Sequence, residues 1–136
     1  MFSLSQYIFV LDALNFCFWP LPGYEYDTLA SSLKRELEAD SKAFDAHRLA
    51  TMTPSKLQNI LMRTFLGKEM EMELGMEMAG EVVPFPLLEE RARLLRELGT
   101  VLENEYDGFA INLVKEANHN AEILVDLIVE KLPGFR

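Results

Sequence analysis

Three residues near the start of the chain have the types and the spacing to form a small polar site. Asp12, Asn15 and Trp19 follow one another at i, i+3 and i+7, so they share one face of a helix that is otherwise apolar nearly all round. A carboxylate, an amide and an indole on one face can bind a flat heterocycle, by hydrogen bonds to its edge and by stacking on its ring. The same side chains could instead satisfy backbone groups or an arginine where helices cross, and the spacing leaves both interpretations open.

Arg91 is a further candidate because it interrupts an apolar stripe. It stands in the middle of the clearest amphipathic pattern of the chain, where an aliphatic residue is expected, so its guanidinium should be buried. A buried guanidinium requires an acceptor of negative charge, which Asp12, Glu90 or a ligand phosphate could supply. An ion pair that only joins two helices is an equal interpretation.

Other groups that could carry chemistry are weak. His47 and His119 lie far apart in sequence and have no cysteine or carboxylate at ligand spacing, so we expect no metal site. The methionines between positions 70 and 78 offer sulfur ligands for copper(I), but their Met/Glu run is more typical of a low-complexity loop. The sequence contains no glycine-rich phosphate loop, nucleophile elbow or HExxH motif.

The composition restricts the class of partner. The chain has 136 residues, 49% of them apolar, which suits one domain with one core. Its net charge of −9 disfavours binding to a nucleic-acid backbone, although one or two cations can still hold a single phosphate. A small phosphorylated ligand such as a mononucleotide therefore remains open, and we expect no direct contact with nucleic acid.

The compartment is predicted from one cysteine and one apolar stretch. Cys17 is the only cysteine, which excludes an internal disulfide and suits the cytoplasm or nucleus. The apolar stretch from Tyr7 to Leu21 has no basic residue before it, contains two polar residues and is too short to span a membrane. We expect a buried helix there and no membrane segment.

Periodicity and capping signals predict an all-α chain with a single helical domain over residues 1–136. Proline and glycine at positions 20–23 end the first helix, and a Thr-Pro pair begins the fourth. The expected helices run from Ser3 to Trp19, from a cap at Asp27, from Asp45 to Met52, from Pro54, from Leu87 to Tyr106, from Ile111 to Glu116 and from Asn118 or Asn120 to Leu132, with a loop over about 68–86.

Several separated segments resemble one protein family. They are LDALNFCFWP at 11–20, YEY at 24–26, PLLEERA at 86–92, NLV at 112–114 and LPGFR at 132–136. In this order they closely resemble the queuosine salvage proteins, over nearly the whole chain apart from the Met/Glu run.

The resemblance implies a fold similar to part of a helix-hairpin-helix DNA glycosylase. It also implies hydrolysis of the N-glycosidic bond of queuosine 5′-phosphate, which releases queuine for reinsertion into transfer RNA, without a metal or organic cofactor. Within this family Asp12 becomes the candidate catalytic carboxylate, Asn15 a hydrogen-bond partner and Phe16 and Trp19 contacts of the base. Arg91 becomes a counter-ion of Asp12 or a phosphate contact.

Family members are much longer, so we expect a shortened member. Surface left by missing segments could then support self-association. Two alternatives remain. One is a non-catalytic truncated member. The other is a nucleic-acid-binding module, because Leu132-Pro133-Gly134 resembles the turn of a helix-hairpin-helix element.

Overall fold

The computed structural model describes residues 4–18, 23–72, 85–118 and 120–135, and these residues form seven α-helices, one short 3-10 helix and no strand. The elements are α1 (Leu4–Leu14), α2 (Tyr26–Ala39), α3 (Ala46–Ala50), α4 (Pro54–Met72), α5 (Leu88–Glu105), α6 (Ala110–Glu116), α7 (Ala121–Lys131) and the 3-10 helix η1 (Pro133–Phe135). The all-α prediction is confirmed for this part of the chain. None of these helices is long and apolar enough to cross a membrane.

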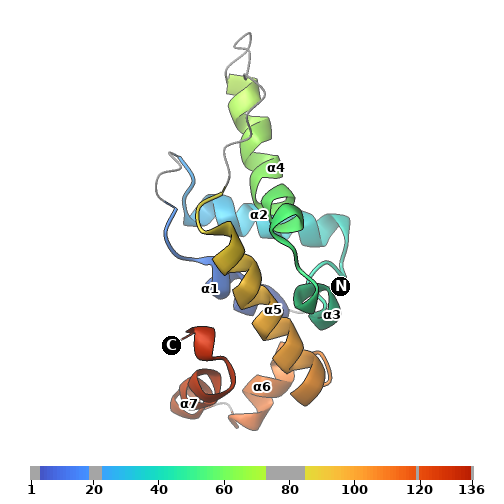
Figure 1. Cartoon of the computed structure of the whole chain (residues 1–136), viewed down its shortest axis with the longest axis vertical. Helices are drawn as coiled ribbons and strands as arrows, with labels where there is room; N and C mark the ends of the chain where they lie inside the picture. The colour runs from blue at the N-terminus through green and yellow to red at the C-terminus, as the bar shows by residue number, and fades with distance from the viewer. Residues whose placement is uncertain (1–3, 19–22, 73–84, 119, 136) are drawn as a thin grey trace.

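Helix α5 runs through the middle of the molecule and is contacted by α1, α3, α4 and η1 (Figure 1). Its leucines at 95, 98 and 102 are fully buried because they repeat at intervals of three and four residues. Helices α2 and α4 pack against each other on one side of it, while α6 and α7 lie at the opposite end with the C-terminus. The core is therefore organised around α5.

Helices α3 and α5 approach each other closely at Gly99. A Cβ added to Gly99 would lie 2.5 Å from the carbonyl oxygen of Ala46 and 2.7 Å from Cβ of Leu49. Real side chains do not come so close, so only glycine allows this packing distance.

Three predicted helix starts are confirmed by their caps. Asp45 is the N-cap of α3, and the Thr53 hydroxyl oxygen accepts a hydrogen bond of 3.2 Å from the amide of Lys56 at the start of α4. The Asn120 side chain accepts from the amides of residues 122 and 123 at the start of α7.

Other predicted boundaries were wrong. Helix α1 ends at Leu14 and does not continue toward Trp19. Helix α2 is capped by Glu25, two residues before the predicted Asp27, because Glu25 forms a capping box with Thr28. Leu87, the predicted first residue of the fifth helix, is instead the N-cap of α5, with a side chain 51% exposed and a positive φ of 53°.

The predicted loop over about 68–86 needs correction at both ends. Helix α4 continues to Met72, so the first part of the Met/Glu run is helical. Phe85 is buried in the core, 4.8 Å from the ring centre of Tyr24. Residues 73–84 lie outside the described part of the chain, as does Ser3, the predicted first cap.

Candidate active site

Asp12 lies in a groove of about 260 Å³ between α1, α6, α7 and η1. The lining residues are Ser5, Ile8, Phe9, Asp12, Val114, Leu124, Ile128 and Phe135. Among them Asp12 is the only charged side chain, and Ser5 is the only other polar one. The groove is therefore an apolar site with a single carboxylate, the composition expected of a pocket for a largely apolar or aromatic ligand.

One face of α1 forms the near wall of the groove. Ser5, Ile8, Phe9 and Asp12 are spaced i, i+3, i+4 and i+7, so they line up along the same side of the helix. The opposite side carries buried residues such as Val10 and attaches α1 to the core. The core thus fixes α1 with Asp12 facing outward.

The far wall includes Phe135, which η1 holds in place. The Phe135 amide donates to the carbonyl of Leu132 at 2.9 Å, and Leu132 is fully buried. The amide of Gly134 donates to Oε1 of Glu97 on α5, also at 2.9 Å. These bonds tie the aromatic wall of the groove to the central helix.

The arrangement suits chemistry on a bound ring. Asp12 is exposed, and the described residues show no ion pair or hydrogen bond to it. A carboxylate of this kind can orient a water molecule or face positive charge that develops on a ligand held by the apolar walls.

The other predicted site residues do not line this groove. Asn15 is exposed just beyond the end of α1, and Phe16 is half-buried with its ring centre 4.0 Å from the guanidinium carbon of Arg91. Trp19 lies outside the described residues. The structure therefore brings Phe16 and Arg91 together, and neither of them lines the groove that contains Asp12.

Arg91 is fully buried, as predicted, but its partners are not carboxylates. Nε donates to the carbonyl of Pro86 at 2.8 Å, Nη1 to that of Leu14 at 2.5 Å, and Nη2 to those of Phe16 and Cys17. Asp12 is not among the partners of Arg91, and the other predicted partner, Glu90, pairs with Arg93 at 3.2 Å instead. The expected counter-ion is thus replaced by four backbone acceptors.

The bonds of Arg91 end α1 and shape the turn after it. The Leu14 carbonyl lies at the negative end of the α1 dipole, where a cation is favourable. Burial lowers the pKa of Arg91 to about 10, which still leaves it cationic at neutral pH. Because the guanidinium is covered by the protein, Arg91 acts here as a positioning residue for the segment that carries Asn15.

Sequence reasoning missed most of the groove. The apolar lining of α1, Ile8 and Phe9, precedes Asp12 by four and three residues, and this spacing could have revealed a shared face. The contribution of α7 was not predicted, because Leu124 and Ile128 have the spacing of a stripe that faces the core. They are only half-buried, and no residue of α7 is fully buried.

Within the described residues, no group of three or more histidine, cysteine, aspartate or glutamate side chains could hold a metal ion. His47 lies 3.5 Å from a carboxylate oxygen of Glu103 on the exposed surface, and His119 is outside the described residues.

Comparison with known proteins identifies the family. The family model described as queuosine salvage protein matches residues 2–136, and the chain belongs to this family. Relatives from several organisms carry the name queuosine 5′-phosphate N-glycosylase/hydrolase. The chain is 38% identical to the one from Dictyostelium discoideum over 97% of its length, 39% identical to the one from Sphaerobacter thermophilus over 98%, and 27% identical to the one from Mus musculus over 96%.

The relatives are considerably longer. The matched region is 35% of the Dictyostelium protein, 39% of the Sphaerobacter protein and 38% of the mouse protein. The chain thus spans little more than a third of the length of these relatives.

Proposed function

We propose that this chain takes part in hydrolysis of the N-glycosidic bond of queuosine 5′-phosphate, which releases queuine for reuse in transfer RNA. The observation that carries the proposal is the family match over residues 2–136. The names of the relatives and the carboxylate in an apolar groove support it.

The chemistry assigns a role to Asp12. When the bond between the ribose carbon and the base nitrogen breaks, positive charge develops on the sugar, and a nearby carboxylate stabilises it. Asp12 would face this charge and orient the attacking water, whose oxygen bonds to the sugar carbon while a proton passes to the departing base. The aromatic side chains of Phe9 and Phe135 would hold the base.

The turn after α1 supplies the remaining proposed contacts. Asn15 is exposed and offers an amide to the edge of a base, while Arg91 and Phe16 hold the turn from inside. Trp19 is proposed as a stacking residue on the family resemblance alone. Further groups would come from the rest of a longer family polypeptide, because the relatives extend well beyond the matched region.

The experiment is incubation of the purified, folded chain with queuosine 5′-phosphate, followed by mass spectrometry for free queuine. We expect release, and a loss of about 100-fold in rate for Asp12→Asn, the usual scale for removing one stabilising group of a transition state. Asp27→Asn removes another exposed carboxylate, at the start of α2, and should keep the wild-type rate.

Two outcomes would count against the proposal. Equal rates for Asp12→Asn and wild type would remove Asp12 from the chemistry. The chain could also melt cooperatively, and so be folded, but neither release queuine nor bind it. That result would show that these residues do not carry the activity.

The nucleic-acid alternative is not favoured by the η1 turn. In that interpretation the amides around Gly134 would grip a phosphate, but the Gly134 amide already donates to the carboxylate of Glu97. A carboxylate at this point repels phosphate, and the net charge of −9 acts in the same direction. We place the reaction in the cytoplasm, or also in the nucleus, because a lone cysteine suits a reducing compartment.

A further inference from the structure

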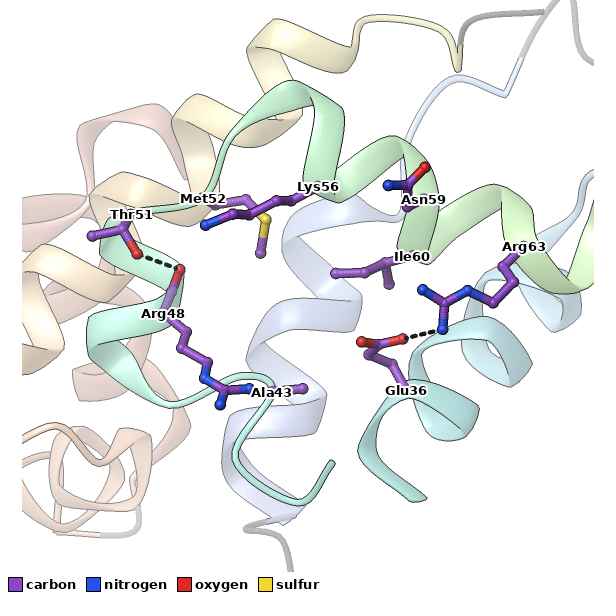
Figure 2. Close-up of a pocket in the computed structure, with 9 residues that line it drawn as sticks. All are labelled: Glu36, Ala43, Arg48, Thr51, Met52, Lys56, Asn59, Ile60 and Arg63. Carbon is purple, nitrogen blue, oxygen red and sulfur yellow. Dashed lines mark hydrogen bonds and ion pairs between the residues drawn. The ribbon is translucent and has the colours of Figure 1, made fainter. Parts of the chain in front are cut away.

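A second pocket lies between α2, α3 and α4 and shares no lining residue with the Asp12 groove (Figure 2). Its volume is about 330 Å³. The residues that line it are Glu36, Ala43, Arg48, Thr51, Met52, Lys56, Asn59, Ile60 and Arg63. They include three cations and one anion, although the whole chain has 22 acidic and only 13 basic residues.

The polar side chains come from two facing walls. Lys56, Asn59 and Arg63 are spaced i, i+3 and i+7, so they lie along one face of α4. Arg48 comes from α3 on the opposite wall, and Figure 2 shows Ile60 pointing into the space between the walls. The pocket therefore combines an apolar interior with cations on both sides.

Both arginines are held by the protein's own carboxylates. Arg63 lies 3.5 Å from Oε2 of Glu36, and Arg48 donates to Asp40. Each guanidinium has five N–H donors, and these two pairs use one nitrogen of each arginine, so donors remain for a ligand. The structure shows no ion pair of Lys56 with another described residue.

This geometry favours a doubly charged ligand with several acceptor oxygens. Because each arginine already has one carboxylate, a second carboxylate gains little. A phosphate group carries nearly two negative charges and three strong acceptor oxygens, and it can contact Lys56 and the remaining N–H groups together. We propose that the pocket between α2, α3 and α4 binds a small phosphate monoester, with the phosphate at Lys56 and the organic part against Met52 and Ile60.

The site does not depend on the glycosidase proposal, because the Asp12 groove is built from α1, α6 and α7. It can be tested by nuclear magnetic resonance titration of the ¹⁵N-labelled chain with sodium phosphate, AMP and adenosine at constant ionic strength. We expect saturable shifts of the amides at 48–52 and 56–60 with AMP, weaker ones with phosphate, and none with adenosine.

A matched pair of variants identifies the cation. Lys56→Gln should weaken AMP binding about tenfold, the usual effect of losing a charge-assisted hydrogen bond. Lys115→Gln removes the same charge from an exposed site on α6 and should leave the affinity within about twofold of wild type. Circular dichroism confirms that both variants keep their helices.

The other outcomes discriminate among ligands. Phosphate binding as tight as AMP would keep the site and make the free ion its ligand. Adenosine binding as well as AMP would overturn the phosphate assignment, because only the apolar interior would then be used. A weak specific site saturates in the millimolar range, so amide shifts that stay linear up to about 50 mM AMP would overturn the proposal. Equal losses of AMP affinity in Lys56→Gln and Lys115→Gln would also overturn it.

Discussion

The guanidinium carbon of Arg91 lies 4.0 Å from the centre of the Phe16 ring, and Nη2 of the same side chain donates to the Phe16 carbonyl at 2.6 Å. One residue thus contacts both the ring and the backbone of a partner 75 positions earlier in the chain. Cation–π contact and hydrogen bonding act together here in a buried site, where both are strong. The turn after α1 is therefore held by α5 in addition to its own backbone bond from the Phe16 amide to the Leu14 carbonyl.

Replacing Arg91 should be costly for stability. Arg91→Met removes the donors to four carbonyls while keeping most of the apolar volume. Each buried acceptor left without a partner costs about 1–3 kcal/mol, partly relieved by relaxation, so we expect the free energy of unfolding to fall by about 3 kcal/mol or more. Urea unfolding measures the change.

The neighbouring arginine provides the control. Arg93 is exposed on the same helix and pairs with exposed Glu90 and, at 3.9 Å, with partly buried Glu97, so Arg93→Met should change the free energy of unfolding by about 0.5 kcal/mol or less. Similar losses for the two variants would contradict the positioning role of Arg91. Arg91→Lys should lie between them, since an ammonium cannot span the same acceptors.

Gly99→Ala should also destabilise the fold, although replacing glycine by alanine within a helix usually stabilises it. In an exposed helix interior this change gains about 1 kcal/mol from helix propensity. At Gly99 the new methyl group meets the backbone of α3 at Ala46, so we expect a loss of about 2 kcal/mol through forced separation of the helices. Thr100, one residue later, is exposed, so Thr100→Ala should be neutral or stabilising. Thermal melts of the two variants and of the wild type measure the difference. Equal stability of Gly99→Ala and wild type would show that α3 can move without cost.

The sequence predicts the helical fold well because capping residues and apolar periodicity mark most of the helices. Local residue types predict the start of α4 at Thr53-Pro54 and the start of α7 at Asn120. The spacing of the leucines likewise predicts the apolar stripe of α5. Burial of Arg91 also follows from its place in that stripe. These features depend on neighbours within a few positions.

Features that depend on distant contacts could not be predicted. The end of α1 at Leu14 lies inside a continuous apolar stretch, and the acceptors of Arg91 are backbone carbonyls, which no residue type reveals. The groove around Asp12 likewise joins α1 to residues more than 100 positions away, such as Val114 and Phe135. Its existence depends on how α7 packs, which periodicity alone does not specify.

Tyr24 predicts a pH dependence of stability. Its hydroxyl donates to the carbonyl of Leu61 at 2.9 Å, and burial raises its pKa to about 12, although the Ser32 hydroxyl and the Arg91 charge act in the opposite direction. Between about pH 10 and pH 12 the unfolded chain loses this proton while the folded chain keeps it. Stability from Tyr24 is therefore present below pH 10 and falls as the pH rises, by at most about 1.4 kcal/mol per pH unit.

Comparison with Tyr24→Phe isolates this effect. The variant should be about 1 kcal/mol less stable than wild type at pH 7, because the Leu61 carbonyl loses the shorter of its two hydroxyl donors and keeps only Ser32 at 3.4 Å. The gap should close or reverse by pH 11, since phenylalanine has no proton to lose. Other titrating groups, including Tyr106, are present in both proteins and cancel. A gap that stays constant from pH 8 to pH 11 would contradict the assignment.

Helix α7 should mediate the predicted self-association. Val125 is 57% and Ile123 is 45% exposed, and no residue of this helix is fully buried. Apolar surface of this kind favours contact with a second apolar face. We expect a concentration-dependent dimer in sedimentation equilibrium that Val125→Lys weakens without lowering the melting temperature.

A second lysine variant separates the loss of apolar contact at Val125 from the change in net charge that any added lysine causes. Adding a lysine changes the net charge from −9 to about −8, which lowers repulsion between copies and by itself favours association. Ser31→Lys makes the same change on the exposed face of α2, so it should leave the dimer intact or strengthen it. Weaker association only in Val125→Lys therefore points to lost apolar contact. A wild-type chain that stays monomeric at every concentration would show that α7 does not bind its own copy.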